Sequence, residues 1–351
     1  MTTPLRRGVP LATGLAFLLL SACAPLGTRS TDGAPASGIA TPSAWQVSDS
    51  AIRPVAVPSD NLATWWRQLG DPMLDELIAQ AVAAAPDARS AQARLRQARA
   101  SRDLADANLL PSLGASGSVN RYRTGASAGG SGDSQTSYAA GFDASWEPSI
   151  FGGLRDAASG AEFDASAAAA SLESTRASLA AEVALNYVNL RTYQRRLAIA
   201  RDNVASQGET LQITEWRAMA GLVTMLDVEQ ARTNLEQSKA SIPSLESGRA
   251  EAEHHLAVLT GQAPGTLHEQ LMAVQPLPTA PVEIAVGIPA DTLRQRPDVQ
   301  AAELTLRAET ARTAEREADR YPSLNLSGSW GWQAFSAASF GGSGSVLHSL
   351  A

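Results

Sequence analysis

Near the middle of the chain, residues 172–197 read LESTRASLAAEVALNYVNLRTYQRRL, inside an alanine-rich segment that runs from Gly153 to Gly261. Apolar residues recur there at intervals of mostly three, four or seven, which predicts one face of a long α-helix. After Gly221 the spacing restarts as a heptad pattern, so we expect two helices joined at this glycine. The apolar positions of the first helix are Leu172, Leu179, Val183, Tyr187, Leu190, Leu197, Val204 and Leu211.

The expected packing surface of this hairpin is rich in alanine, for example in residues 165–170. Alanine buries little apolar area, and at about 25 cal/mol per Å² the hairpin should need further helices to be stable. Taken without its flanks, the segment is also compatible with a solvent-exposed coiled-coil stalk. Pro243 lies in the second helix, where its missing N–H predicts a bend or a local break.

The N-terminal residues predict a secreted chain. Arg6 and Arg7 precede an apolar run that is too short to span a bilayer, so residues 1–22 are interpreted as a signal peptide. The run ends at Cys23, the single cysteine, and residues 20–23 resemble the lipobox of bacterial lipoproteins. This resemblance implies a lipid on Cys23; the alternative is an unmodified thiol. Residues 23–60 are rich in Pro, Gly, Ser and Thr and are interpreted as a tether.

Two segments, residues 112–123 and 138–147, alternate between apolar and polar residues. In the second, Tyr138, Phe142 and Trp146 share one face. About ten residues of such alternation is typical of a membrane β-strand, although a half-buried strand of a soluble sheet alternates in the same way. A third segment with this pattern begins near Leu324.

An internal repeat relates the two ends of the chain. Residues 86–118 align with residues 297–329 at a constant offset of 211, with 13 of 33 positions identical. We therefore expect a first repeat at 61–261, which includes the hairpin 153–261, a linker at 262–295 and a truncated second repeat at 296–351. The second copy is expected to stop in its strand-connecting loop, without its return strand or long helices.

Several spaced motifs resemble the outer-membrane factors of tripartite efflux pumps, of the TolC-like, NodT-type lipoprotein class. The resemblance covers almost the whole chain after the signal peptide. The motifs are Leu20-Ser21-Ala22-Cys23, Trp65-Trp66, Leu69-Gly70-Asp71-Pro72, Glu147-Pro148-Ser149-Ile150-Phe151-Gly152-Gly153, Ala220-Gly221-Leu222-Val223-Thr224, Leu226-Asp227-Val228, Leu293-Arg294-Gln295-Arg296-Pro297-Asp298-Val299 and Tyr321-Pro322-Ser323-Leu324.

This resemblance implies a mainly α fold with membrane β-strands, in a homotrimer that combines a long α-helical coiled-coil hairpin with β-barrel strands. It implies an outer-membrane protein with a lipid anchor and a large periplasmic part. Its partners would be a periplasmic adaptor, an inner-membrane transporter and outer-membrane lipid. The trimer would be a passive exit duct for small molecules, without a cofactor other than the lipid on Cys23, without a metal and without catalysis.

The resemblance also assigns residues at the hairpin tip. Gly221 would be the tip turn, Leu222, Val223 and Thr224 would form the adaptor-docking face, and Asp227 would help to hold the periplasmic gate closed. The alternative for Asp227 is an ordinary solvated aspartate at the positive end of a helix dipole.

Other function classes have weaker support. The formal charge of −7 argues against nucleic-acid binding. A Gly-x-Ser-x-Gly pattern at residues 125–129 lies between predicted strands and not at the strand-to-helix turn of a hydrolase. His254 and His255 are adjacent on a helix and cannot chelate one metal, while His268 and His348 lie in loop-like sequence. A periplasmic adaptor and a non-functional truncated fragment of a channel remain as alternatives.

Overall fold

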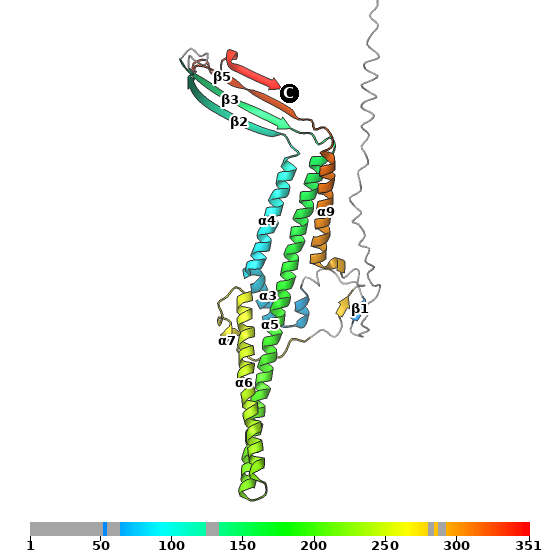
Figure 1. Ribbon diagram of the computed structural model, residues 1–351, viewed down its shortest axis with the longest axis vertical. Helices are drawn as coiled ribbons and strands as arrows, with labels where there is room; N and C mark the ends of the chain where they lie inside the picture. The colour runs from blue at the N-terminus through cyan, green and yellow to red at the C-terminus, as the bar shows by residue number, and fades with distance from the viewer. Residues whose placement is uncertain (1–51, 55–63, 124–132, 280–283, 287–292) are drawn as a thin grey trace, which may run out of the picture. The chain divides into compact units, whose positions relative to one another are not determined.

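A computed structural model describes residues 52–54, 64–123, 133–279, 284–286 and 293–351 (Figure 1). The predicted signal peptide, Cys23 and nearly all of the tether lie outside the described residues, as does the Gly-x-Ser-x-Gly pattern at 125–129. Within the described part, no helix is both long enough and apolar enough to cross a bilayer.

The predicted hairpin is confirmed. Helix α5 spans Gly153–Met219, and α6 spans Met225–Leu259 and packs along it (Figure 1). With 67 residues, α5 is about 100 Å long at the usual rise per residue. Helix α6 runs through Pro243 without interruption, so the expected break does not occur. One lost N–H is a local cost, and the contacts of α6 with α5 along its length outweigh it.

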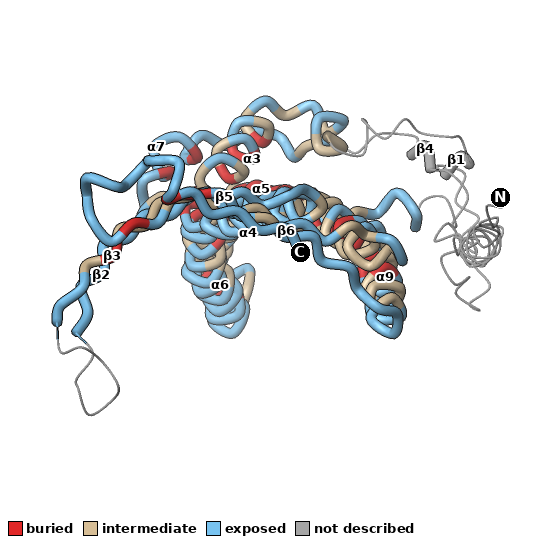
Figure 2. Tube along the Cα trace, turned by 90° about the horizontal axis from the view of Figure 1, so that it is seen from above, coloured by how far each residue is buried: buried red, intermediate tan, exposed pale blue. Residues whose placement is uncertain are grey.

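Three further helices pack against α5: α3 (Pro72–Ala84), α4 (Pro86–Ala107) and α9 (Pro297–Ala318). Small residues form these contacts, as the alanine pattern predicts. Ala308 and Ala311 of α9 are almost completely buried, and a Cβ added at Gly160 of α5 would come 3.5 Å from the Ala308 carbonyl oxygen. Buried residues lie on the inner faces of the helices, and the outer faces of α6 and α9 are mostly exposed (Figure 2).

The main hydrophobic core lies where α3, α5 and α6 meet the segment that follows α6. Its members come from α3, α4, α5 and α6, from the short helix α7 (His268–Leu271) and from cap residues next to these helices. The largest fully buried members are Leu74, Leu77, Ile78, Val183, Tyr187, Leu190, Leu256, Leu267 and Leu271.

A buried polar network crosses this core. The Tyr187 hydroxyl donates to Asp71 Oδ2 at 2.7 Å, and Arg191 Nη2 donates to the Tyr187 hydroxyl at 3.1 Å. Arg191 Nη1 also donates to the Ala273 carbonyl, and Gln194 Nε2 donates to the Leu271 carbonyl, both at 2.7 Å. Burial, together with the hydrogen bond to Asp71, raises the pKa of Tyr187 to about 12. The network therefore fixes the segment after α7 against α5.

The strands form a four-stranded antiparallel sheet in the order β2-β3-β5-β6. Strand β2 spans Ser112–Arg123, as predicted, and β3 spans Ser134–Trp146, which begins four residues before the predicted strand and ends one residue before its end. Strand β5 spans Leu326–Ala334. A separate parallel pair, β1 (Ile52–Pro54) with β4 (Ile284–Val286), was not predicted.

Two predictions at the end of the chain are wrong. Residues 346–350, expected in a loop, form strand β6, which pairs with β5. The second repeat therefore contains part of its return strand, and His348 lies in a strand. A pattern of five residues is too short to predict a strand from the sequence. The strand forms here because β5 offers an open edge for backbone pairing.

The two copies of the repeat agree in structure. Adding 211 to the bounds of α4, residues 86 and 107, gives 297 and 318, the bounds of α9. The last residues of β2 and β5, Arg123 and Ala334, differ by the same number. Both helices pack against α5, so one long helix serves as the packing partner of both copies.

Candidate functional site

The turn between α5 and α6 ends the first helix with a glycine in the left-handed conformation. Gly221 has a φ of 73°. Its N–H donates to the Ala218 carbonyl at 2.9 Å, and the N–H of Leu222 donates to the Arg217 carbonyl at 2.8 Å. This pair of bonds is the Schellman motif, which satisfies carbonyls that the helix end would leave unpaired. The structure thus places the predicted turn at Gly221.

The second helix starts with a capping box between Thr224 and Asp227. Asp227 Oδ2 accepts hydrogen bonds from the Thr224 hydroxyl at 2.7 Å and from the Thr224 N–H at 2.8 Å. In return, the Thr224 hydroxyl oxygen accepts from the Asp227 N–H at 3.4 Å. The hydrogen bonds from the Thr224 side chain and backbone lower the pKa of Asp227. The carboxylate that the family resemblance assigns to a gate is therefore also part of the cap at the start of α6.

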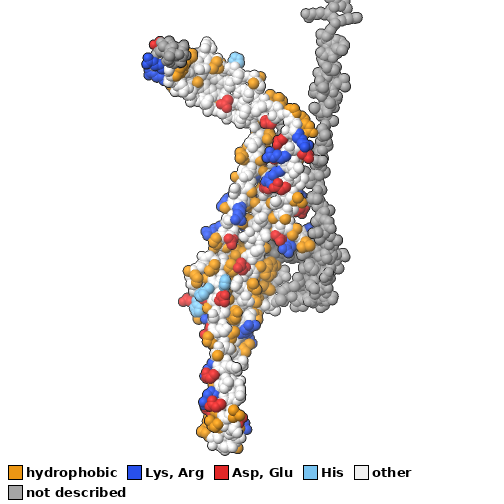
Figure 3. Space-filling view, in the orientation of Figure 1, with side chains coloured by type: hydrophobic (Ala, Val, Ile, Leu, Met, Phe, Trp, Pro, Cys, Tyr) orange, Lys and Arg blue, Asp and Glu red, His pale blue; other side chains and the backbone are white. Residues whose placement is uncertain are grey.

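Four large apolar side chains around this turn face solvent, and we call them the apolar tip. Met219, Leu222, Met225 and Leu226 are each at least 66% exposed. Hydrophobic side chains gather at this end of the hairpin in Figure 3. A cluster of exposed apolar side chains is typical of a surface that binds another protein or a membrane.

The tip includes only part of the predicted docking face. Leu222 and Thr224 are exposed, whereas Val223 is partly buried. Sequence reasoning missed Met219, Met225 and Leu226. Their apolar character and their position beside a predicted turn were visible, but the sequence does not say which side of each helix the partner helix covers.

The sheet has two chemically different faces, as the strand alternation predicts. Residues paired in register share a face, so Phe142 lies beside Ala115 on one side and Trp330 on the other. We call this the apolar face. Its apolar side chains include Leu113, Ala115, Val119, Tyr138, Ala140, Phe142, Trp146, Leu326, Trp330, Trp332 and Val346, and Arg121, Arg123 and His348 share this face by register.

The opposite face, the polar face, carries mainly small hydroxyl and amide side chains. The hydroxyls of Ser112 and Ser145 lie 2.8 Å apart, as do those of Ser329 and Ser349. These contacts link neighbouring strands across the sheet. Polar side chains on this face are Ser112, Ser116, Ser118, Asn120, Tyr122, Gln135, Ser137, Asp143, Ser145, Ser327, Ser329, Gln333 and Ser349.

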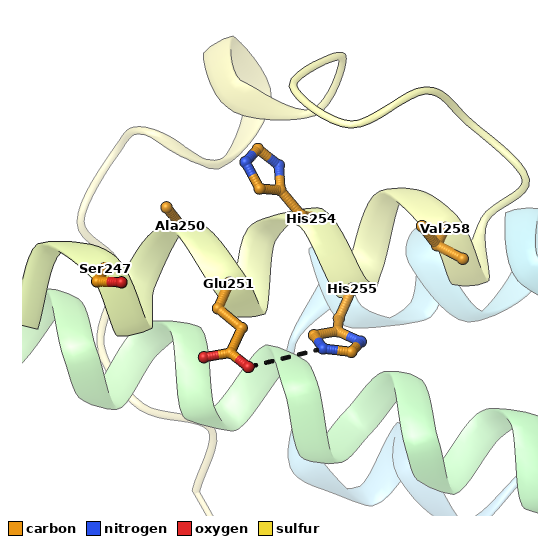
Figure 4. Close-up of a pocket in the computed structure, with 6 residues that line it drawn as sticks. All are labelled: Ser247, Ala250, Glu251, His254, His255 and Val258. Atoms are coloured by element: carbon orange, nitrogen blue, oxygen red, sulfur yellow. Dashed lines mark ion pairs between the residues drawn. The ribbon is translucent and has the colours of Figure 1, made fainter.

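The histidines do not form a metal site within the described part of the chain. Figure 4 shows that His254 and His255 point in different directions from α6, with His255 Nε2 4.0 Å from Glu251 Oε1. They line a shallow hollow of about 440 Å³. His268, expected in a loop, instead starts α7, where its Nδ1 lies 2.9 Å from the buried Glu253 carboxylate. Among the residues with assigned positions, no three ligating side chains converge.

Comparison with known proteins identifies similar chains. The model of the family described as "Outer membrane efflux protein" matches residues 77–262. Nodulation protein T of Rhizobium leguminosarum bv. trifolii is 32% identical over 276 residues, which are 76% of this chain and 57% of that protein. The pyoverdine export outer membrane protein OpmQ of Pseudomonas aeruginosa is 31% identical over 320 residues, or 89% of this chain and 66% of that protein.

The fold is also found in solved structures. The outer-membrane channel OprN has a TM-score of 0.77 and 32% identity, with coverage of 88% of this chain and 69% of that chain. The outer membrane protein VceC of Vibrio cholerae, at 23% identity and a TM-score of 0.73, shares the fold, with coverage of 82% of this chain and 69% of that chain. The present chain spans 57% and 66% of the length of the two curated relatives above.

Replacing Thr224 with Ala should fray the first turn of α6. The change removes the hydroxyl that binds Asp227, so the pKa of Asp227 should rise toward its ordinary value, and amide exchange in this turn should become roughly fivefold faster, the factor for loss of a typical N-cap. In the unchanged protein, the contribution of the Asp227 carboxylate is present above about pH 4 and is lost as the pH falls through its lowered pKa. NMR titration of the carboxyl and hydrogen exchange measure both effects.

Thr233→Ala is the matched control, because the Thr233 hydroxyl bonds the Glu229 carbonyl within α6 and does not contact Asp227. An unchanged Asp227 titration in Thr224→Ala would contradict the capping box.

Proposed function

The chain belongs to the outer membrane efflux protein family, and we propose that copies of it assemble into the outer-membrane channel of a tripartite efflux system. The observation that carries this proposal is a sheet with one apolar and one polar face, joined to a long helical hairpin. Such a sheet can face lipid on one side and water on the other. The fold is that of TolC-like channels.

The open edges of the sheet support assembly from several copies. Within the described strands, β2 and β6 are the edge strands. In a bilayer, unpaired backbone groups at such edges cost several kcal/mol each, so each edge must pair with another strand. Closing a sheet around a path takes about eight strands or more, which a four-stranded sheet does not provide. A homotrimer would satisfy both requirements.

In this assembly the helices would extend into the periplasm, and the apolar tip would dock on a periplasmic adaptor that connects to an inner-membrane transporter. The exposure of Met219, Leu222, Met225 and Leu226 supports this role, because an unpaired apolar cluster at the end of a hairpin suits a protein partner. The channel would pass small molecules passively, driven by the transporter, with no cofactor and no chemical step.

Leu222→Asp should weaken docking while leaving the channel in the membrane. A charge in place of an apolar anchor at an interface should weaken adaptor binding by about tenfold or more. The experiment compares dye efflux and adaptor crosslinking in Gram-negative cells that lack their own efflux channel and carry the cognate adaptor and transporter. Met272→Asp is the control, because Met272 is similarly exposed but lies outside the tip.

Two results would argue against the proposal. If cells that express the unchanged protein in their outer membrane show no efflux, the channel function is contradicted. Normal efflux and crosslinking by Leu222→Asp would contradict the docking role alone.

We also propose that Asp227 contributes a negative charge that helps to keep the channel entrance closed. Its exposure at the start of α6, next to the tip, supports this role. Asp227→Asn keeps an oxygen that can accept from the Thr224 N–H but removes the charge, so it should increase uptake of large antibiotics. Thr224→Ala, which keeps the charge and weakens the cap, should not. If uptake of large antibiotics rises equally in both variants, Asp227 has only a structural role.

Lipidation of Cys23 remains a proposal that rests on the residues at 20–23. Cys23→Ser should prevent incorporation of radioactive palmitate, because serine lacks the sulfur that takes the diacylglycerol. A Ser21→Thr variant, which keeps the cysteine, should still be labelled. Label on the Cys23→Ser protein would rule out this anchor.

A further inference from the structure

The polar face of the sheet carries one charged side chain. In β2, β3, β5 and β6, all of which are described, Asp143 is the only carboxylate or cationic residue whose register places it on this face. The two arginines of β2, Arg121 and Arg123, belong to the opposite face by register. Serine, asparagine, glutamine, glycine and a few apolar side chains make up most of the remainder. The face therefore has a local negative charge at a defined position.

A hollow lies beside this carboxylate. Gly141 and Gly331 are paired directly in register, and a Cβ added at Gly331 would come 2.7 Å from the Gly141 Cα and 2.5 Å from the Ala140 carbonyl oxygen. The two strands are thus very close, and there is no side chain above them. The resulting hollow has a volume of about 200 Å³, and its lining includes Asp143, Ser329 and Gln333.

The carboxylate lies across the neighbouring strand. Gly114 of β2 opposes Asp143 in register, and a Cβ at Gly114 would meet Asp143 Oδ2 at 2.6 Å and Oδ1 at 2.9 Å. Glycine at position 114 therefore leaves room for the carboxylate in this position. None of the ion pairs among the described residues involves Asp143. Its charge is therefore not compensated by an arginine, lysine or histidine in this part of the chain.

Small hydroxyl and amide groups surround this charge. Ser329 pairs with Asp143 in register, and Gln333 lies two pairs further along the same face. In Figure 3, the side of the sheet turned to the viewer is mostly white, the colour of the backbone and of side chains that are neither hydrophobic nor charged. At about 30 Å³ per water, the hollow has room for a small hydrated cation.

From this geometry we infer that the hollow beside Asp143 is a weak cation site in the wall of the channel. The inference rests on the proposed function, because the polar face lines a water-filled path only if several copies close around it. Each copy would then contribute one Asp143 carboxylate, and a ring of carboxylates favours cations over anions. The ligands are alkali-metal ions and small organic cations, held by charge and by hydroxyl and amide oxygens.

The test is the ion preference of the purified full chain in a planar lipid bilayer under a KCl gradient, read as the reversal potential. Asp143→Asn keeps the shape of the side chain and removes its charge. The ratio of K⁺ to Cl⁻ permeability should fall by about two- to fivefold, the effect of one charge acting through water at a few ångströms. Asp298→Asn is the control, since it removes the same charge from the start of α9, outside the sheet.

A second variant separates charge from structure. In Asp143→Asn combined with Ser329→Asp, the carboxylate moves to the directly paired position on the same face, and cation preference should return. If Asp143 had only a structural role, moving the carboxylate to position 329 would not restore the cation preference. An unchanged permeability ratio in Asp143→Asn, or no recovery in the double variant, would overturn the inference while leaving the channel function intact. A chain that conducts no ions at all would overturn both.

Discussion

The small-residue surface of α5 is the constraint on which the rest of the structure depends. Alanine and glycine let neighbouring helices approach closely, but each buries little area, so stability must come from contact along a great length and with several partners. Helices α3, α4, α6 and α9 all pack on α5. Glycine also makes room for a large ring between α5 and α6. A Cβ added at Gly248 of α6 would come 2.6 Å from the Tyr193 ring of α5.

The buried polar network adds specificity to this extended packing. Arg191 is 1% exposed, and its guanidinium stacks over the Tyr187 ring at 4.8 Å while it bonds the Ala273 carbonyl. A buried cation needs hydrogen-bond partners to offset the loss of hydration. Here the Ala273 carbonyl, the Gln194 side chain and the Tyr187 hydroxyl accept from its two Nη groups, while its Nε has no partner among the described residues. These bonds hold the segment after α6 against α5. That segment leads the chain from the first repeat to the second.

The sheet relies on the same helices in a different way. In a single chain, its strands are exposed on both faces. Contacts at the helix-to-strand junctions attach the sheet to the helices: Trp146 Nε1 donates to the Leu109 carbonyl at 3.0 Å, and the Phe151 ring stacks on the Tyr321 ring with 4.9 Å between their centres. Open edges and an apolar face leave the sheet dependent on further copies and on lipid. The two ends of the molecule thus offer different chemistry, with exposed methionine and leucine at the hairpin turn and a two-faced sheet at the other end of α5.

The sequence by itself determined the features that depend on local periodicity: the hairpin and its turn at Gly221, the bounds of β2, the two faces of the strands, and the repeat that relates α4 to α9. Spacing along a helix or strand fixes which residues share a face, and glycine fixes a left-handed turn. Only the tertiary structure decided the strand order, the pairing of β1 with β4, the existence of β6, the exposure of Met219, Met225 and Leu226, and the hollow beside Asp143. These features arise when residues far apart in the chain meet, as Gly141 meets Gly331, and no local pattern encodes which distant partner each residue will have.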